Sequence, residues 1–164
     1  MGRNVTKSNF SAFSGVGIGS AVMISVWLLM ALSALPVNAQ QTKTYIARLS
    51  VVPLTVEMQA TVAGRGSAKA VLTGNKLTVD GTFDGLRSPA TAGRIHLAPR
   101  AVRGPAVLEL TVSKGTSGTI SGSLELTPRQ VEALEKSSLY IQLHSEKAPD
   151  GNLWGWLLPQ EEKR

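Results

Sequence analysis

The two histidines of the sequence, His96 and His144, are the side chains best suited to carry chemistry. Each lies in a stretch where apolar and polar residues alternate, as in a half-buried strand, and each takes the side opposite the apolar row. Imidazole nitrogen is a common ligand of copper and zinc. One hypothesis is therefore a shared site in which His96 and His144 bind copper or zinc loosely, with Asp150 or Glu146 as a third ligand.

The residue inventory favours a structural role for both imidazoles instead. Closed zinc sites and redox copper sites normally use three or four nitrogen or sulfur ligands, whereas the chain has two histidines and no cysteine. Arg94 shares the predicted strand face of His96, and its cation would repel a metal ion. We therefore expect no cofactor, with the imidazoles hydrogen-bonding across a sheet or at strand ends, and keep the loose copper or zinc site as the alternative.

Trp154 and Trp156 put two indoles on one face of the last predicted strand. If they are buried, they cover an edge of the core. If they are exposed, they form a contact surface for an extracytoplasmic protein or a glycan. The pair is therefore the candidate surface for recognition.

Enzymatic chemistry and nucleic-acid binding are not indicated. The serines lie mostly in glycine-rich turns, and no Gly-x-Ser-x-Gly turn is present to support a hydrolytic triad. The basic residues are scattered rather than clustered, and few aromatic residues could stack on bases. We predict a protein that is not an enzyme and binds no nucleic acid.

The first forty residues predict export. Arg3 and Lys7 give a basic start, residues 21–35 are almost entirely apolar, and Ala39 ends a small-residue cleavage site. The apolar stretch is shorter than the ~20 residues that cross a bilayer. Cleavage of a signal peptide, residues 1–39, lowers the formal net charge from +6 to +4 and leaves residues 40–164 as one periplasmic or secreted domain. The alternative is an uncleaved anchor, through which alone we expect a membrane association.

Beyond the signal, period-two alternation and glycine-rich turns predict an all-β domain. The predicted strands are 44–51, 55–63, 67–73, 77–83, 93–98, 106–113, 118–126, 138–145 and 152–158. We expect an antiparallel, Greek-key-like β-sandwich or barrel with a core over about 44–158 and at least seven strands in two packed sheets.

One short helix is predicted near residues 128–136. Thr127 is a good N-cap, Pro128 suits the first helical position, and Gln130 completes a capping box. Leu126 and Val131 are spaced for a hydrophobic staple. The helix is too short to be stable alone, so we expect it to close one end of the β domain.

The order of motifs resembles the CHRD domain, the repeated module of chordin that also occurs in secreted bacterial proteins. The resemblance rests on Tyr45-Ile46-Ala47-Arg48-Leu49, Arg94-Ile95-His96, Gly104-Pro105-Ala106-Val107, Leu139-Tyr140-Ile141-Gln142-Leu143-His144 and Pro149-Asp150-Gly151-Asn152-Leu153-Trp154-Gly155. It implies a secreted β-sandwich and no catalytic residue. Arg94, Gln142 and Trp154 depart from the residues typical of that family.

A second segment resembles part of Cu/Zn superoxide dismutase. His144-Ser145-Glu146-Lys147-Ala148-Pro149-Asp150 is similar to a His-Glu-Lys-x-x-Asp segment of that β-sandwich enzyme. The enzyme's site uses about six histidines, and this chain has two. The resemblance therefore argues for a related sandwich at most, and against dismutase activity.

The signal-peptide assignment predicts the mass of the exported protein. Because the peptidase is expected to cut after Ala39, the mature chain begins at Gln40. Intact-mass spectrometry of exported protein checks this. A mass that retains residues 1–39 would show instead that the segment is an uncleaved anchor.

Overall fold

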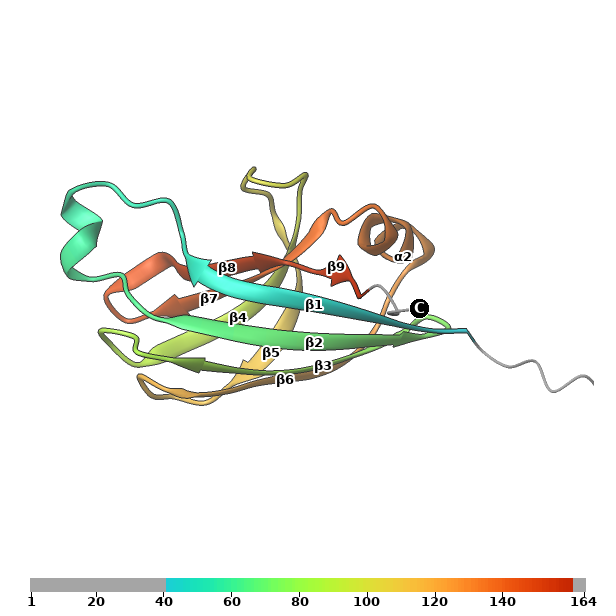
Figure 1. Ribbon diagram of the computed structural model, residues 1–164, viewed down its shortest axis with the longest axis horizontal. Coiled ribbons are helices and arrows are strands. Elements are labelled where there is room, and N and C mark those ends of the chain that lie inside the picture. The colour runs from blue at the N-terminus through green and yellow to red at the C-terminus, as the bar shows by residue number, and fades with distance from the viewer. Residues whose placement is uncertain (1–40, 161–164) are drawn as a thin grey trace, which may run out of the picture. The chain divides into compact units, whose positions relative to one another are not determined.

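The computed structural model describes residues 41–160. They form antiparallel strands, one α-helix and one 3₁₀ turn (Figure 1). In chain order these are β1 (Thr42–Val51), η1 (Glu57–Ala60), β2 (Arg65–Thr73), β3 (Lys76–Asp84), β4 (Ala90–Leu97), β5 (Ala106–Val112), β6 (Gly118–Glu125), α2 (Pro128–Glu135), β7 (Leu139–Ser145), β8 (Ala148–Trp156) and β9 (Leu158–Pro159).

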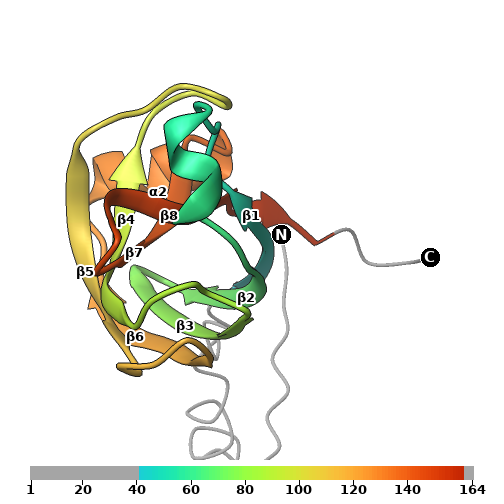
Figure 2. The ribbon, with the colours of Figure 1, turned by 90° about the vertical axis from the view of Figure 1, so that its left-hand side faces the viewer.

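The strands make one sheet that closes into a barrel. Their order is β2-β3-β6-β5-β4-β7-β8-β1-β9, and an additional β1–β2 pairing closes the ring, which Figure 2 shows from one end. Strands β4, β5 and β6 are neighbours in sequence order, while β7 returns to pair with β4. This is the Greek-key connection that the sequence predicted.

The all-β fold is confirmed, and of the two expected architectures the barrel is the one observed. The expectation of two separate packed sheets was wrong. Strand β1 is ten residues long, and it pairs with β2 along one edge and with β8 and β9 along the other. One strand thereby connects both sides of the wall into a single closed sheet.

The predicted strand 55–63 was also wrong. This segment contains the 3₁₀ turn η1 within an excursion between β1 and β2. Residues 55–63 alternate between apolar and polar side chains, but β1 and β2 already pair with each other, so no strand edge is available for this segment to pair with. Val62 is buried in a small cluster with Val52 and Ala148, whereas Val56 is 78% exposed.

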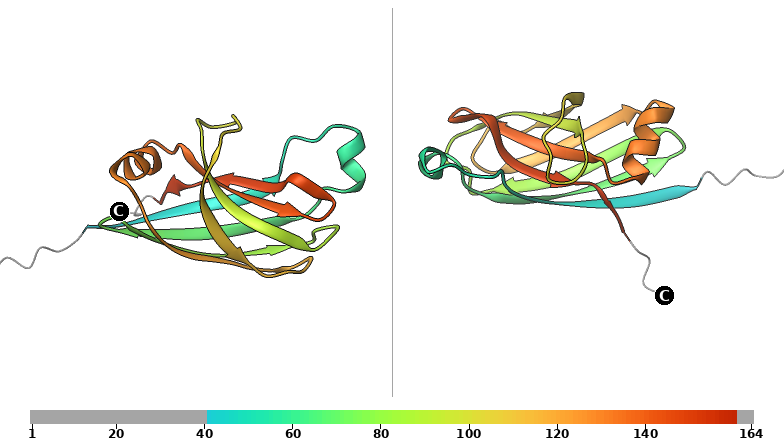
Figure 3. Two further views of the ribbon diagram at one scale, coloured as in Figure 1. Left: turned by 180° about the vertical axis from the view of Figure 1, so that it is seen from behind. Right: turned by 90° about the horizontal axis from the view of Figure 1, so that it is seen from above.

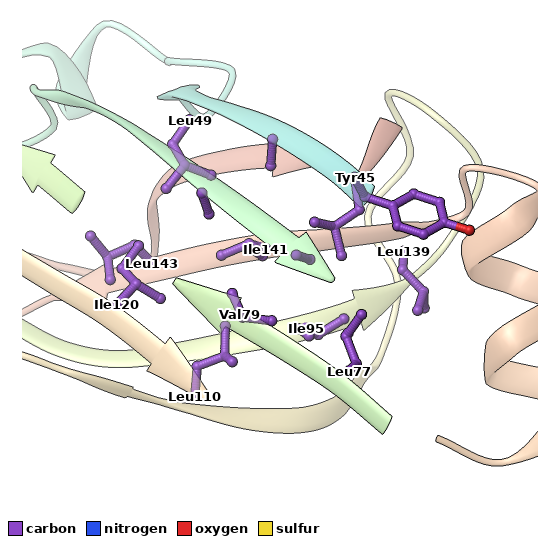
Figure 4. Close-up of a cluster of buried hydrophobic side chains, with 14 of the residues drawn as sticks. Tyr45, Leu49, Leu77, Val79, Ile95, Leu110, Ile120, Leu139, Ile141 and Leu143 are labelled. Atoms are coloured by element: carbon purple, nitrogen blue, oxygen red, sulfur yellow. The ribbon is translucent and has the colours of Figure 1, made fainter. Parts of the chain in front are cut away.

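The barrel interior is filled by the inward row of each strand. Figure 4 shows Tyr45, Leu77, Ile95, Ile120 and Ile141 converging from different strands. These side chains are at most 2% exposed, and the burial of the whole cluster to which they belong stabilises the fold. All the other predicted strands are confirmed, because their apolar rows face this common core.

Helix α2 packs at one end of the barrel (Figure 1). Ala133 and Leu134 on its inner face are buried in the main core. The capping box is confirmed: the Gln130 backbone N–H donates to Thr127 Oγ1 at 3.3 Å, and the Thr127 N–H donates to Gln130 Oε1 at 2.8 Å. The helix ends as predicted near Lys136, where Ser137 adopts a φ of 54°.

Strand β7 is unusual because every one of its residues is buried. Leu139, Ile141 and Leu143 face the core. Tyr140 and His144 lie on the outer face, yet they are covered by neighbouring chain segments. The polar side chains on this outer face therefore need partners within the protein.

The predicted signal peptide, residues 1–39, lies outside the described residues. Within residues 41–160, no helix combines the length and apolar character needed to cross a membrane. The cleavage site and the exported location stay predictions.

The capping box generates a stability prediction. Thr127→Ala removes the hydroxyl that accepts the Gln130 N–H, so the free energy of unfolding should fall by about 1 kcal/mol. Urea denaturation followed by circular dichroism measures this. Because Thr127 is exposed, a loss of several kcal/mol would contradict a role limited to capping.

Candidate functional site

The candidate site lies on the outer face of β4, β7 and β8. The strand register aligns Arg94 with Gln142 and His96 with Tyr140. On the other side of β7, Trp156 lies opposite Tyr140. The pairing therefore gathers the outward polar and aromatic residues of three adjacent strands on one area of the barrel wall.

Two loop segments cover this area. One connects β4 to β5, projects from the barrel wall and is seen from above in Figure 3. The other is the start of β8 at Pro149-Asp150-Gly151. Arg103 of the first segment donates to the Asp150 carbonyl of the second at 2.9 Å, so the two segments hold each other in place.

Glycines allow both segments to approach the strands closely. A Cβ on Gly104 would lie 2.0 Å from the Leu97 carbonyl oxygen. A Cβ on Gly151 would lie 2.4 Å from Gln142 Nε2, and Gly151 also has a φ of +125°. Glycine, which has no Cβ, allows the close approach at both positions and the positive φ at Gly151 without displacing the chain. The Gly104-Pro105 and Asp150-Gly151 motifs therefore place backbone carbonyls directly over the outer side chains.

His96 is held by the first segment. Its Nδ1 donates to the Gly104 carbonyl at 2.8 Å. Its ring stacks on Tyr140 with centroids 5.0 Å apart. The Tyr140 hydroxyl in turn accepts the Gly104 N–H at 3.1 Å. Gly104 thus binds the two stacked rings through both of its backbone polar groups.

His144 is held by the second segment in the same way. Its Nδ1 donates to the Pro149 carbonyl at 2.8 Å, and Gln142 Nε2 donates to the Asp150 carbonyl at 2.9 Å. A carbonyl only accepts, so Nδ1 carries the proton in both His96 and His144. Each neutral ring then has an unprotonated Nε2.

The two imidazoles lie close together in a buried setting. Their ring centroids are 6.2 Å apart. His96 is 9% exposed and His144 is 6% exposed. The Nε2 atom of each is buried without a hydrogen-bond partner. A buried pair of unpaired acceptors is uncommon and needs a physical explanation.

The electrostatics of the site favour neutral imidazole at His144. Burial lowers the pKa of His144 below 6.5, and the nearby charge of Arg94 acts in the same direction. The hydrogen bond to Pro149 opposes this shift. Arg94 itself donates to Glu109 Oε1 at 2.8 Å, so its positive charge is partly compensated.

The two tryptophans lie beside this buried pair and line an open groove. Trp154 and Trp156 are both half-buried, with ring centroids 4.7 Å apart and planes at 66°. Arg48 and Arg100 also line the groove, which has a volume of about 370 Å³. Trp156 Nε1 donates to the Ala98 carbonyl at 3.4 Å. The indoles therefore both cover the barrel wall and present part of their surface.

The structure brings some of the predicted site residues together. The prediction that His96 and His144 oppose the apolar row is confirmed. His144 hydrogen-bonds to the Pro149 carbonyl at the start of the adjacent strand β8, whereas His96 hydrogen-bonds to the Gly104 carbonyl in the connection between β4 and β5. Asp150 joins the site through its backbone carbonyl. Among residues 41–160, no three or more His, Cys, Asp or Glu side chains gather as a metal-binding group.

Sequence reasoning missed the supporting residues. Alternation places Tyr140 and Gln142 opposite the apolar row of their strand but does not indicate that they are covered, and in the structure they are 0% and 4% exposed. The large side chains on both faces of Leu139-Tyr140-Ile141-Gln142-Leu143 were a usable signal, since such a strand is buried on both sides. Arg48 and Arg100 gave no signal, because they come from separate parts of the chain.

The lowered pKa of His144 predicts a pH dependence of stability. Below about pH 6.5 the unfolded chain takes up a proton that folded His144 resists, so the stabilisation is complete above this pH and is lost as the pH falls towards the folded pKa. The slope from this group is at most about 1.4 kcal/mol per pH unit. Urea unfolding of metal-free protein between pH 7.5 and 5 should show it.

His144→Gln should flatten this pH dependence while keeping an amide donor near Pro149. Thr127→Ala is the control, because it destabilises the fold without touching a titrating group, and its pH profile should parallel that of the unmodified protein. Parallel profiles for all three proteins would show that His144 is not the group responsible.

Comparison with known proteins agrees with this architecture. The family model of the CHRD domain matches residues 46–157, which include part of β1, all of β2 to β8 and both histidines. No curated protein and no solved structure matched the sequence. Because the matched region covers most of the chain, the protein belongs to the CHRD domain family.

Proposed function

We propose that this CHRD domain protein acts outside the cytoplasm, in the periplasm or as a secreted protein, as a non-enzymatic binding module. Membership of the CHRD family supports a recognition role, and the basic start with its short apolar stretch supports export. The observation that carries the proposal is the groove lined by Trp154 and Trp156.

The groove has the composition of a protein-recognition hot spot. Tryptophan and arginine are the residue types most enriched at such positions, because they combine large apolar area with directed polar contacts. Here two indoles and two guanidinium groups line one surface, and the remaining lining is largely apolar. It includes Ile46, Leu158 and Pro159.

The charges indicate what kind of partner the groove takes. Arg48 and Arg100 are exposed, and neither forms an ion pair with another side chain among residues 41–160. An acidic side chain beside an apolar anchor would satisfy both the guanidinium groups and the apolar lining. We infer a protein partner that presents an acidic and apolar segment.

A glycan is the less favoured partner. Stacking of sugar rings needs open, flat indole faces, whereas Trp154 and Trp156 are half-buried and meet at 66°. Trp156 is also fixed by its hydrogen bond to Ala98. The aromatic surface therefore suits insertion of one apolar side chain better than a row of sugars.

A peptide library displayed on phage tests this function. Peptides selected on the purified protein should share an acidic residue near a large apolar one. The double variant Arg48→Glu/Arg100→Glu should bind the selected peptides at least about tenfold more weakly, since it reverses both charges. The affinities are measured by fluorescence anisotropy with synthetic peptides.

The matched control is Lys76→Glu/Arg129→Glu, which changes the net charge equally at exposed residues that do not line the groove. It should bind as the unmodified protein does. An equal loss of peptide affinity in both double variants would show that net charge, rather than the groove arginines, determines binding. Selected peptides without acidic residues, or binding to a glycan array in place of peptides, would contradict the proposed partner.

A further inference from the structure

The unpaired Nε2 atoms of His96 and His144 carry an inference that does not depend on the groove or its partner. Both Nδ1 atoms donate to backbone carbonyls at 2.8 Å, so each neutral ring presents a bare lone pair at Nε2. Both Nε2 atoms are buried and have no partner among the described residues. A buried acceptor that lacks a partner destabilises the fold, and a hydrogen-bond donor or a cation at Nε2 would remove that cost.

The hydrogen bonds also prepare the imidazoles as metal ligands. Histidines that bind metals usually donate the other ring N–H to a backbone carbonyl or a carboxylate, which fixes the tautomer and the ring orientation. The Gly104 and Pro149 carbonyls do this for His96 and His144. Each ring is therefore restrained by a loop that a glycine holds close to the sheet.

The ring separation leaves room for one ion between two Nε2 atoms that point toward each other. With metal–nitrogen bonds of about 2.0 Å, a linear Nε2–metal–Nε2 unit places the two ring centroids about 6.3 Å apart. The observed centroid separation is 6.2 Å. Arg94, whose charge acts on His144, is neutralised in part by its ion pair with Glu109, which lessens its repulsion of a cation.

We propose that His96 and His144 bind one Cu(I) ion through their Nε2 atoms, in a two-coordinate and nearly linear geometry. In the tautomer that the two carbonyls fix, each neutral ring binds the ion through Nε2 without loss of a proton. The buried setting also excludes the water that would promote oxidation or add further ligands.

The donor set selects Cu(I) over zinc. Zinc sites are normally tetrahedral with four ligands, and among residues 41–160 no third carboxylate, histidine or cysteine joins the pair. A closed-shell, monovalent copper ion accepts two ligands in a line, and it adds a single positive charge to a buried site. The single charge also limits the cost of desolvation and the repulsion from Arg94.

Anaerobic titration tests the site directly. Protein expressed from the full coding sequence and purified is titrated with Cu(I) in competition with bicinchoninate, whose copper complex is coloured. One equivalent of Cu(I) should transfer to the protein. His96→Gln and His144→Gln should each weaken binding by more than about 100-fold, since each removes one of two ligands.

Thr127→Ala is the matched control, because it lowers stability by about 1 kcal/mol and lies outside the site. It should bind Cu(I) as the unmodified protein does. Binding that persists in both histidine variants would overturn the proposal, as would no transfer from bicinchoninate.

X-ray absorption at the copper edge keeps the proposal testable if a histidine variant fails to fold. The unmodified protein loaded with one equivalent should show the intense pre-edge feature of two-coordinate Cu(I), with two nitrogen scatterers of imidazole. A three- or four-coordinate edge, or sulfur scattering from a methionine such as Met58, would contradict the site.

Discussion

The structure depends on the burial of both faces of β7. A barrel wall normally has one face against the core and one towards solvent, so its outer residues find water as a partner. In β7 the outer residues Tyr140, Gln142 and His144 are instead covered, and burying their polar groups without hydrogen bonds would cost several kcal/mol. The covering segments remove part of this cost because they bring backbone carbonyls to the side chains, while the Nε2 atoms of both histidines stay unpaired. Gly104, Pro149 and Asp150 each supply one such carbonyl.

The same arrangement determines the chemistry available at the site. The Gly104 and Pro149 carbonyls each accept a hydrogen bond from the Nδ1–H of one imidazole. The same hydrogen bonds therefore hold the covering segments and leave Nε2 of each neutral ring as an acceptor. The histidines can therefore hold the covering segments and also serve as metal ligands. Replacement of either histidine should affect both the stability of the covered face and the binding of a metal. The outer surface of the neighbouring strand carries the groove of Trp154 and Trp156, which is more open and takes a different kind of ligand. The outer face of the barrel thus carries the buried histidine pair beside a more open groove.

The sequence predicted the features that are encoded locally. Alternation marked the strands, Thr127 and Gln130 marked the helix start, and the two histidine segments marked neighbouring strands. It failed at 55–63, where alternation is present but no edge is free to pair with the segment. It could not show that Tyr140 and His144 are covered, because the cover comes from residues that are distant in the sequence from the strand that carries them. It also could not distinguish the carboxylate of Asp150 from its carbonyl, and the structure uses the carbonyl.

The tautomers of the two imidazoles test this description most directly. Long-range ¹H–¹⁵N correlation spectra of metal-free, ¹⁵N-labelled protein at pH 7.5 distinguish a protonated ring nitrogen from a bare one. If the loop carbonyls hold both rings, His96 and His144 will each show a protonated Nδ1 and an unprotonated Nε2. A ring protonated at Nε2 alone, or one that averages between tautomers, would contradict the fixed hydrogen bonds on which both the covered face of β7 and the paired lone pairs depend.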